Sequence, residues 1–79
     1  MKYQNKGGGI VEYVERLSAV RKAKGITQRQ VCDALNITQQ QYSKYERGVN
    51  ELPVRYLIEI CRFLDISADW LLGLNDHEY

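Results

Sequence analysis

The chain has 79 residues, of which 44% are hydrophobic and 27% are charged, and its formal net charge is +1. This length accommodates one small domain, and the composition is that of an ordinary globular protein. No apolar run approaches the roughly 20 residues that cross a bilayer, and the polar N-terminus resembles neither a signal peptide nor a lipidation signal. We therefore expect a cytoplasmic protein.

Charge is unevenly distributed along the chain. Residues 1–50 contain nine basic and four acidic side chains, whereas residues 51–79 contain two basic and six acidic ones. One part of a small domain can therefore face a polyanion while the other part does not. Chance clustering of surface charge produces the same asymmetry, so other features have to decide between the two interpretations.

Cysteine and histidine are too few for a zinc site. Cys32 and Cys61 fall at helix-core spacings, which favours reduced, buried thiols in a cytosolic chain. The single histidine, His77, lies in a polar segment near the C-terminus. A zinc site needs about four such ligands. We expect no metal, no cofactor and no small-molecule ligand.

The first ordered element is predicted to be a helix that follows a flexible leader. Residues 1–9 end in three glycines, which favours a flexible segment. Apolar residues at helical spacing then run from Ile10 to Val20, with Arg21 at the edge of that face. Gly25 is expected to end this helix.

Two short helices are expected next, and each begins with the pattern T-x-x-Q. Thr27 and Gln30 have the spacing of a capping box, in which each side chain bonds the backbone N–H of the other residue. Thr38 and Gln41 repeat this spacing. Asn36 is expected to end the second helix, because Asn tolerates a left-handed backbone.

The remaining helices complete the chain. The third helix is expected to end at Arg47, and Pro53 suits the first turn of a fourth helix. That fourth helix is apolar over much of its girth, so we expect it at the centre of the fold. Ser67 is predicted to cap a short fifth helix, which ends at Gly73 before a polar tail, residues 75–79.

Together these patterns predict an all-α domain of five helices over residues 10–74. Only residues 36–38 separate the second and third helices, and a turn this short between two helices defines the helix-turn-helix arrangement. We expect this motif at about residues 28–47. Its tight crossing requires a small residue, which either Cys32 or Ala34 can supply.

The third helix has two different faces on a helical wheel. Tyr42, Tyr45 and Glu46 share the inward face. The other face has hydrogen-bond donors and no acid, and it consists of Gln39, Gln40, Ser43, Lys44 and Arg47. Gln pairs bidentately with adenine, while Lys and Arg favour guanine or phosphate. A merely solvated face usually mixes Glu with Lys, so this composition favours DNA binding.

Four motifs occur in order along the chain: RKAKGITQ, YxxYERG, LP and DISADWLLG. In this combination they resemble the lambda-repressor and Cro type of helix-turn-helix domain, the Xre family of bacterial and phage regulators. The resemblance covers roughly residues 14–74. It implies a lambda-repressor-like fold and a sequence-specific DNA-binding transcriptional regulator, of the repressor kind, from a bacterium or phage.

The resemblance also implies roles for individual positions. Base edges would be read by four residues of the third helix: Gln39, Gln40, Ser43 and Lys44. Phosphate contacts are expected from residues around the motif: Thr27, Gln28, Tyr42, Arg47 and Asn50. Tyr42 is included because its hydroxyl could extend to a phosphate from a position that usually holds Ile or Leu. Arg21 and Glu46 would form an internal ion pair, and helical wheels place both at the edges of buried faces.

A homodimer is expected, because one recognition helix reads only a few base pairs. The candidate dimer surface is C-terminal and includes Trp70, Leu72 and Leu74. Trp70 has an alternative role, in which it covers the core under the first helix.

Two other classes of function compete with DNA binding. An antitoxin-like or protein-interaction module on the same fold is the first alternative. An enzyme is not expected, because no nucleophile is paired with a base and Ser43 has no nearby histidine in the sequence.

Overall fold

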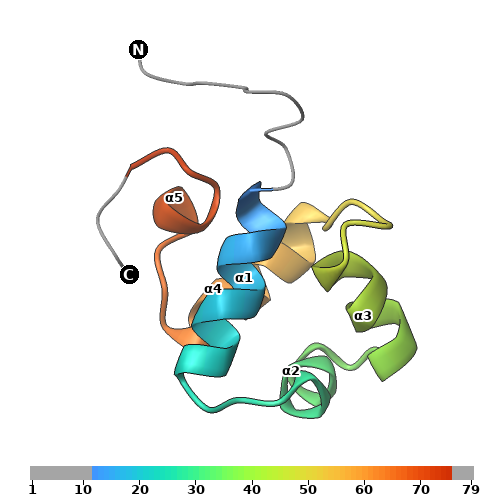
Figure 1. Cartoon of the computed structure of the whole chain (residues 1–79). Coiled ribbons are helices and arrows are strands. Elements are labelled where there is room, and N and C mark those ends of the chain that lie inside the picture. The colour runs from blue at the N-terminus through green and yellow to red at the C-terminus, as the bar shows by residue number, and fades with distance from the viewer. Residues whose placement is uncertain (1–11, 76–79) are drawn as a thin grey trace.

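The computed structural model describes residues 12–75, and this stretch is all-α (Figure 1). Its helices in chain order are α1 (Glu12–Ala23), α2 (Gln28–Leu35), α3 (Gln39–Glu46), α4 (Val54–Leu64) and α5 (Ala68–Leu71). The predicted leader, the predicted helix start at Ile10 and the tail beyond Asn75 lie outside the described residues. Within the described residues, no helix has the length and hydrophobicity needed to cross a membrane.

The helices pack around one core. α2 packs against α3 and α4, α1 packs against α3 and α5, and α4 also contacts α5. Figure 1 shows α2 and α3 on one side of α1, with α5 on the other side. The buried residues of this core are Leu17, Val20, Val31, Cys32, Leu35, Tyr42, Tyr45, Ile60, Leu64, Ile66 and Leu71. α1 and α4 therefore pack against the inner side of the α2–α3 pair. The outer side of α3 remains exposed.

Both helix starts in the α2–α3 pair are capped, but in different ways. Thr27 and Gln30 form the complete capping box, in which the Thr27 hydroxyl accepts from Gln30 N–H and Gln30 Oε1 accepts from Thr27 N–H. Thr38 likewise accepts from the N–H of Gln41 at 3.0 Å. The side chain of Gln41 does not return that bond, and its Nε2 instead donates to the Tyr45 hydroxyl at 3.2 Å. The predicted second capping box is therefore only half formed.

The turn between α2 and α3 has the backbone that the sequence predicts. Asn36 has φ of 60° in the left-handed region, and its N–H bonds back to α2 carbonyls. Of the two small residues proposed for the helix crossing, Cys32 is buried and Ala34 is exposed. Cys32 therefore supplies the close approach, and its thiol is free, as is that of Cys61.

The fourth helix differs from the sequence prediction in two respects. Pro53 precedes the helix as its N-cap, with φ −65° and ψ 150°, rather than lying in the first turn. The helix is also not buried on all sides. Ile60 is buried, but Val54, Ile58 and Phe63 are 68%, 46% and 43% exposed. The main packing partners of α4 are α2 and α5, and part of its apolar surface faces solvent.

Candidate nucleic-acid interface

A buried ion pair joins the first and third helices. Arg21 Nε donates to Glu46 Oε2 at 2.6 Å, and Arg21 Nη2 donates to Glu46 Oε1 at 3.1 Å. The two side chains are only 9% and 4% exposed. A third guanidinium nitrogen, Nη1, donates to the carbonyl of Ile26 at 2.8 Å. The guanidinium of Arg21 therefore fixes the angle between α3 and α1. It also holds the chain segment that leads into α2.

Two further side chains complete this network around Glu46. The Tyr42 hydroxyl donates to Glu46 Oε2 at 2.6 Å, and Gln28 Nε2 donates to Glu46 Oε1 at 3.0 Å. The family resemblance implies that Gln28 supports the third helix, but neither hydrogen bond to Glu46 was predicted. The first has a local signal, because Tyr42 and Glu46 are four residues apart on one helix. The bond from Gln28 depends on how α2 crosses α3, which no local pattern gives.

The expected phosphate contact of Tyr42 is wrong. This side chain is 0% exposed, and its hydroxyl is engaged by the Glu46 carboxylate. A buried phenol needs a hydrogen-bond partner, and Glu46 supplies one inside the protein. Tyr42 therefore has a structural role and does not reach the surface of α3.

The network shifts the pKa values of its members. Burial acts to raise the pKa of Glu46, but hydrogen bonds from Arg21, Tyr42 and Gln28 outweigh burial and hold that pKa below its usual value. Burial and the bond to Glu46 raise the pKa of Tyr42 far above its usual value. The hydrogen bond to Glu46 also raises the pKa of Arg21, against the opposing effect of burial. The folded protein thus favours ionised Glu46 and neutral Tyr42.

These shifts predict how stability depends on pH. Because the pKa of Glu46 is lowered, its contribution is present above the unfolded value of about 4.3 and is lost as pH falls through the folded value. Because the pKa of Tyr42 is raised, its contribution is present below the unfolded value of about 10 and is lost as pH rises beyond it. Urea unfolding across this range should show both losses. Tyr42→Phe should flatten the alkaline limb and Glu46→Gln the acid limb; unchanged limbs would contradict the assignment.

The outer face of α3 carries the predicted base-contacting residues. Gln39 and Gln40 are exposed in the first turn of the helix, and Ser43 and Lys44 are half-buried one turn later. The structure thus brings all four onto one side of a single helix. This geometry suits insertion into the major groove, which is wide enough to admit an α-helix.

The predicted phosphate contacts surround this face. Arg47 and Asn50 are exposed just after α3, and Arg47 Nε donates to Ser43 Oγ at 3.3 Å. Thr27 uses its hydroxyl in the α2 cap. Gln28 gives one amide hydrogen to Glu46, which leaves its second amide hydrogen for another acceptor. The network around Glu46 therefore also orients a side chain at the start of α2.

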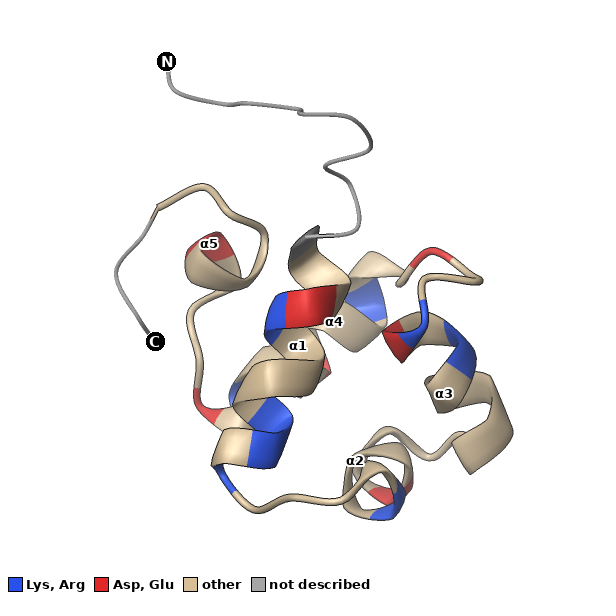
Figure 2. Cartoon of the chain, viewed as in Figure 1, with Lys and Arg blue, Asp and Glu red and all other residues tan. Residues whose placement is uncertain are grey.

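Figure 2 shows Lys and Arg along the C-terminal half of α1, on α2 and on α3. The basic residues in this part of the chain are Arg21, Lys22, Lys24, Arg29, Lys44 and Arg47. Glu46 is the acidic residue of α3, and the network buries it. Burial of this one carboxylate leaves the exposed surface of α3 with basic and neutral polar side chains only.

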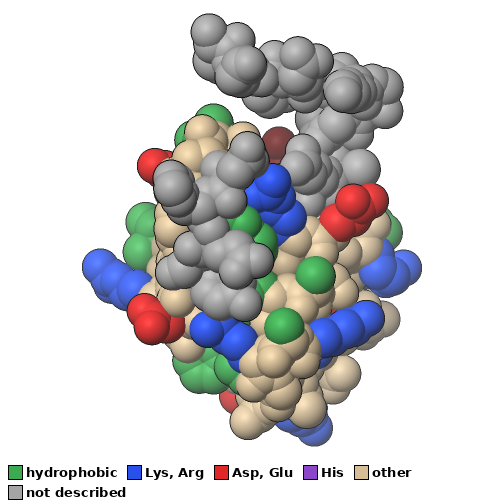
Figure 3. Space-filling view, turned by 60° about the vertical axis from the view of Figure 1, so that its left-hand side comes forward, with side chains coloured by type: hydrophobic (Ala, Val, Ile, Leu, Met, Phe, Trp, Pro, Cys, Tyr) green, Lys and Arg blue, Asp and Glu red, His purple; other side chains and the backbone are tan. Residues whose placement is uncertain are grey.

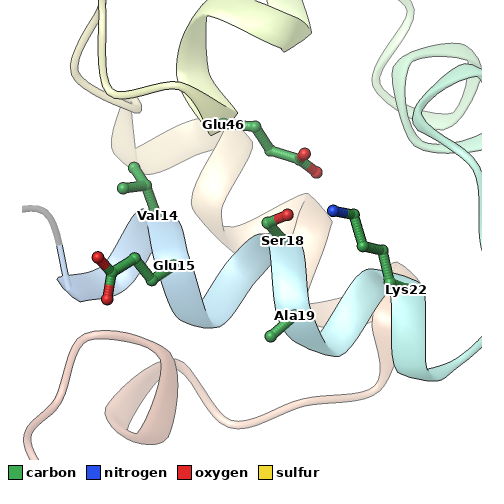
Figure 4. A pocket seen from close by; sticks show the side chains of 6 residues that line it. All are labelled: Val14, Glu15, Ser18, Ala19, Lys22 and Glu46. Carbon is green, nitrogen blue, oxygen red and sulfur yellow. The ribbon is translucent and has the colours of Figure 1, made fainter.

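A shallow hollow of about 520 Å³ lies along α1, where Glu46 of α3 faces α1. Val14, Glu15, Ser18, Ala19, Lys22 and Glu46 line it (Figure 4). Its charges are mixed, and five of its six residues belong to α1. Residues 12–75 include no group of three or more His, Cys, Asp or Glu side chains placed to hold a metal ion. The candidate interface is therefore the α2–α3 surface.

The domain is all-α, the turn between α2 and α3 is short and left-handed, and the third helix is rich in hydrogen-bond donors. Together these features define a helix-turn-helix protein. A family model described as helix-turn-helix (HTH_3) matches residues 17–71, so the chain belongs to this family. The family is one of DNA-binding transcription regulators, and its type is not typically enzymatic.

Curated relatives are bacterial regulators. The chain is 42% identical over 66 residues to the uncharacterized HTH-type transcriptional regulator YqaE of Bacillus subtilis, covering 84% of this chain and 57% of YqaE. It is 41% identical over 59 residues to the cryptic phage CTXphi transcriptional repressor RstR of Vibrio cholerae, covering 75% of this chain and 53% of RstR. The chain thus matches little more than half the length of these relatives.

A solved structure has the same fold. The crystal structure of a transcriptional regulator from Listeria innocua superposes with a TM-score of 0.72 at 24% identity, covering 85% of this chain and 63% of that one. At this identity the likeness shows the fold, and it agrees with the predicted five-helix, all-α class.

Proposed function

We propose that this chain is a sequence-specific DNA-binding transcriptional regulator, of the repressor kind, that acts in the cytoplasm. The observation that carries the proposal is the outer face of α3, where Gln39, Gln40 and Lys44 project from one side of the helix without an acidic neighbour. In this mechanism α3 enters the major groove and α2 crosses the DNA backbone.

Base and backbone contacts would be divided between the two helices. Gln39, Gln40, Ser43 and Lys44 would meet base edges, because side chains of these types bond the donor and acceptor groups of the major groove. Arg47, Asn50 and Gln28, with the backbone at Thr27, would contact phosphates and fix the register of α3. The ion pair between Arg21 and Glu46 keeps α3 at the angle that this docking requires.

The test is selection of bound sequences from random duplex DNA, followed by measurement of affinity at several salt concentrations. The proposal predicts enrichment of a defined sequence and a linear fall of log affinity with log salt concentration. The alternative, an antitoxin-like or protein-interaction module, predicts that no sequence is enriched. The acid-free face of α3 favours DNA over a hydrophobic protein partner.

We further propose that the regulator acts as a homodimer through its C-terminal region. Leu72 and Leu74 remain 42% and 62% exposed. Trp70 instead packs partly on the core, its carbonyl accepts from Arg16 Nη1 at 2.6 Å, and the Arg16 guanidinium lies 5.1 Å from its ring centre. This favours the structural role for Trp70, so we assign the dimer contact to the two leucines. Figure 3 turns the side that carries α5 toward the viewer and shows hydrophobic side chains at that surface.

The dimer proposal predicts that Leu74→Glu weakens self-association, because a carboxylate would be buried against an apolar partner surface. Sedimentation equilibrium, with and without the selected duplex, measures the stoichiometry. Phe63→Glu is a matched control, since Phe63 is 43% exposed but lies on α4, outside the C-terminal region and outside the α2–α3 surface. A monomeric wild-type protein bound singly to its site would contradict the proposal.

A further inference from the structure

A ladder of side chains connects the first turn of α3 to the first turn of α4. Gln41 Nε2 donates to the Tyr45 hydroxyl at 3.2 Å. The ring of Tyr45 lies 5.9 Å from the ring of Tyr56, measured between centroids and tilted by 51°. The guanidinium of Arg55 lies 4.6 Å from the centroid of Tyr56, and Arg55 Nη2 donates to the Tyr56 hydroxyl at 3.3 Å. Each link is short, so this tyrosine ladder holds the Arg55 guanidinium beside α3.

The tyrosine ladder lies at one edge of the exposed face of α3. At about 100° per residue, Gln41 and Glu46 are about 140° apart around the helix. Gln28 bonds Glu46, so the start of α2 flanks one edge of that face and the tyrosine ladder flanks the other. A helix in the major groove has a phosphate strand on each side, since the groove is only about 12 Å wide. The residues predicted from the sequence to touch phosphate, near the start of α2, account for one of these sides.

The charge of Arg55 is available to a ligand. Its contacts in the described structure are a neutral aromatic ring and a phenol, and no ion pair with a described carboxylate engages it. A guanidinium that is stacked on a ring keeps its donors fixed in direction, which favours bonding to phosphate oxygens. Arg62 offers a comparison, because it is an exposed arginine on nearly the same side of α4, seven residues later, without such contacts.

From these observations we infer that Arg55 is a phosphate-binding residue. It contacts the DNA strand on the Tyr45 side of the major groove, and Tyr56 positions its guanidinium. This inference rests on the proposed function, and it adds a contact from α4 to a surface otherwise made by α2, α3 and the loop after α3. Together with Gln28 at the opposite edge, Arg55 would hold α3 in place between the two DNA strands.

The test compares Arg55→Gln with Arg62→Gln in the full chain, bound to the duplex recovered by selection. Each phosphate contact contributes about 0.9 to the slope of log affinity against log salt concentration. Between about 50 and 200 mM salt, wild-type affinity should therefore fall about 3.5-fold more than that of Arg55→Gln. Arg62→Gln should keep the wild-type slope, and Arg55→Lys should largely restore it. Thermal unfolding by circular dichroism checks that each variant is folded.

Equal slopes for Arg55→Gln and wild type would overturn the inference. Equal losses in Arg55→Gln and Arg62→Gln would also overturn it, because the effect would then reflect the total charge of the protein. Wild-type protein that lacks salt-dependent DNA binding would instead overturn the proposed function itself. The failures of the two proposals are therefore distinguishable.

Discussion

Replacing Glu46 with alanine is expected to lower the free energy of unfolding by about 3–5 kcal/mol, the usual cost of removing one partner of a buried ion pair. The variant leaves the guanidinium of Arg21 and the hydroxyl of Tyr42 without their carboxylate. Small domains have a total stability of only about 5–15 kcal/mol, so this loss is a large fraction of it. Urea denaturation followed by circular dichroism measures the change.

Glu15→Ala is the matched control for this prediction. Glu15 is an exposed helical glutamate on α1, and its replacement should change stability by less than about 0.5 kcal/mol. Glu46→Gln keeps an acceptor for Tyr42 and should cost less than Glu46→Ala. If Glu46→Ala matched Glu15→Ala, the buried network would not be what fixes α3 against α1.

Replacing Gln39 or Gln40 with alanine is expected to cost about 1–3 kcal/mol of binding free energy on the selected DNA site. Both side chains are exposed in the first turn of α3, where a recognition helix meets base edges. The loss should be confined to the preferred sequence, because glutamine carries no charge to bind phosphates. Fluorescence anisotropy with the selected duplex and a scrambled duplex separates the two effects.

Arg47→Gln provides the opposite pattern for comparison. Arg47 is exposed at the end of α3, and a phosphate contact there should weaken binding to both duplexes and lower the salt slope. If the Gln39 and Gln40 variants discriminated between the two duplexes as well as wild type does, the recognition surface would lie elsewhere.

Much of the fold could be predicted because its signals are local. The capping box of Thr27 and Gln30 depends on the spacing of two residues within one turn of helix. The left-handed backbone at Asn36 depends on the side-chain chemistry of that one residue. Tyr42 and Tyr45 were assigned to the inward face of α3 from helical periodicity, and both are buried.

The predictions that were wrong concern hydrogen-bond partners and burial by neighbouring helices, which helical periodicity does not specify. Tyr42 was correctly placed inside, but its hydroxyl was assigned to DNA because the sequence does not show what an inward hydroxyl meets. The side chain of Gln41 was expected to accept from the Thr38 N–H, but it instead donates to the Tyr45 hydroxyl, because only the packing of α3 decides how this side chain is oriented. The fourth helix was expected at the centre of the fold, but the neighbouring helices leave Val54 and Ile58 exposed.

The sequence by itself determined the all-α class, the short turn between α2 and α3, and the acid-free outer face of α3. These follow from helical periodicity, capping spacings and side-chain type, all of which act over a few residues. Only the tertiary structure decided that Gln28 of α2 joins Arg21 on the Glu46 carboxylate, and that Tyr45 of α3 meets Tyr56 of α4. These contacts depend on crossing angles between helices, because side chains distant in sequence meet only when packing brings their helices together.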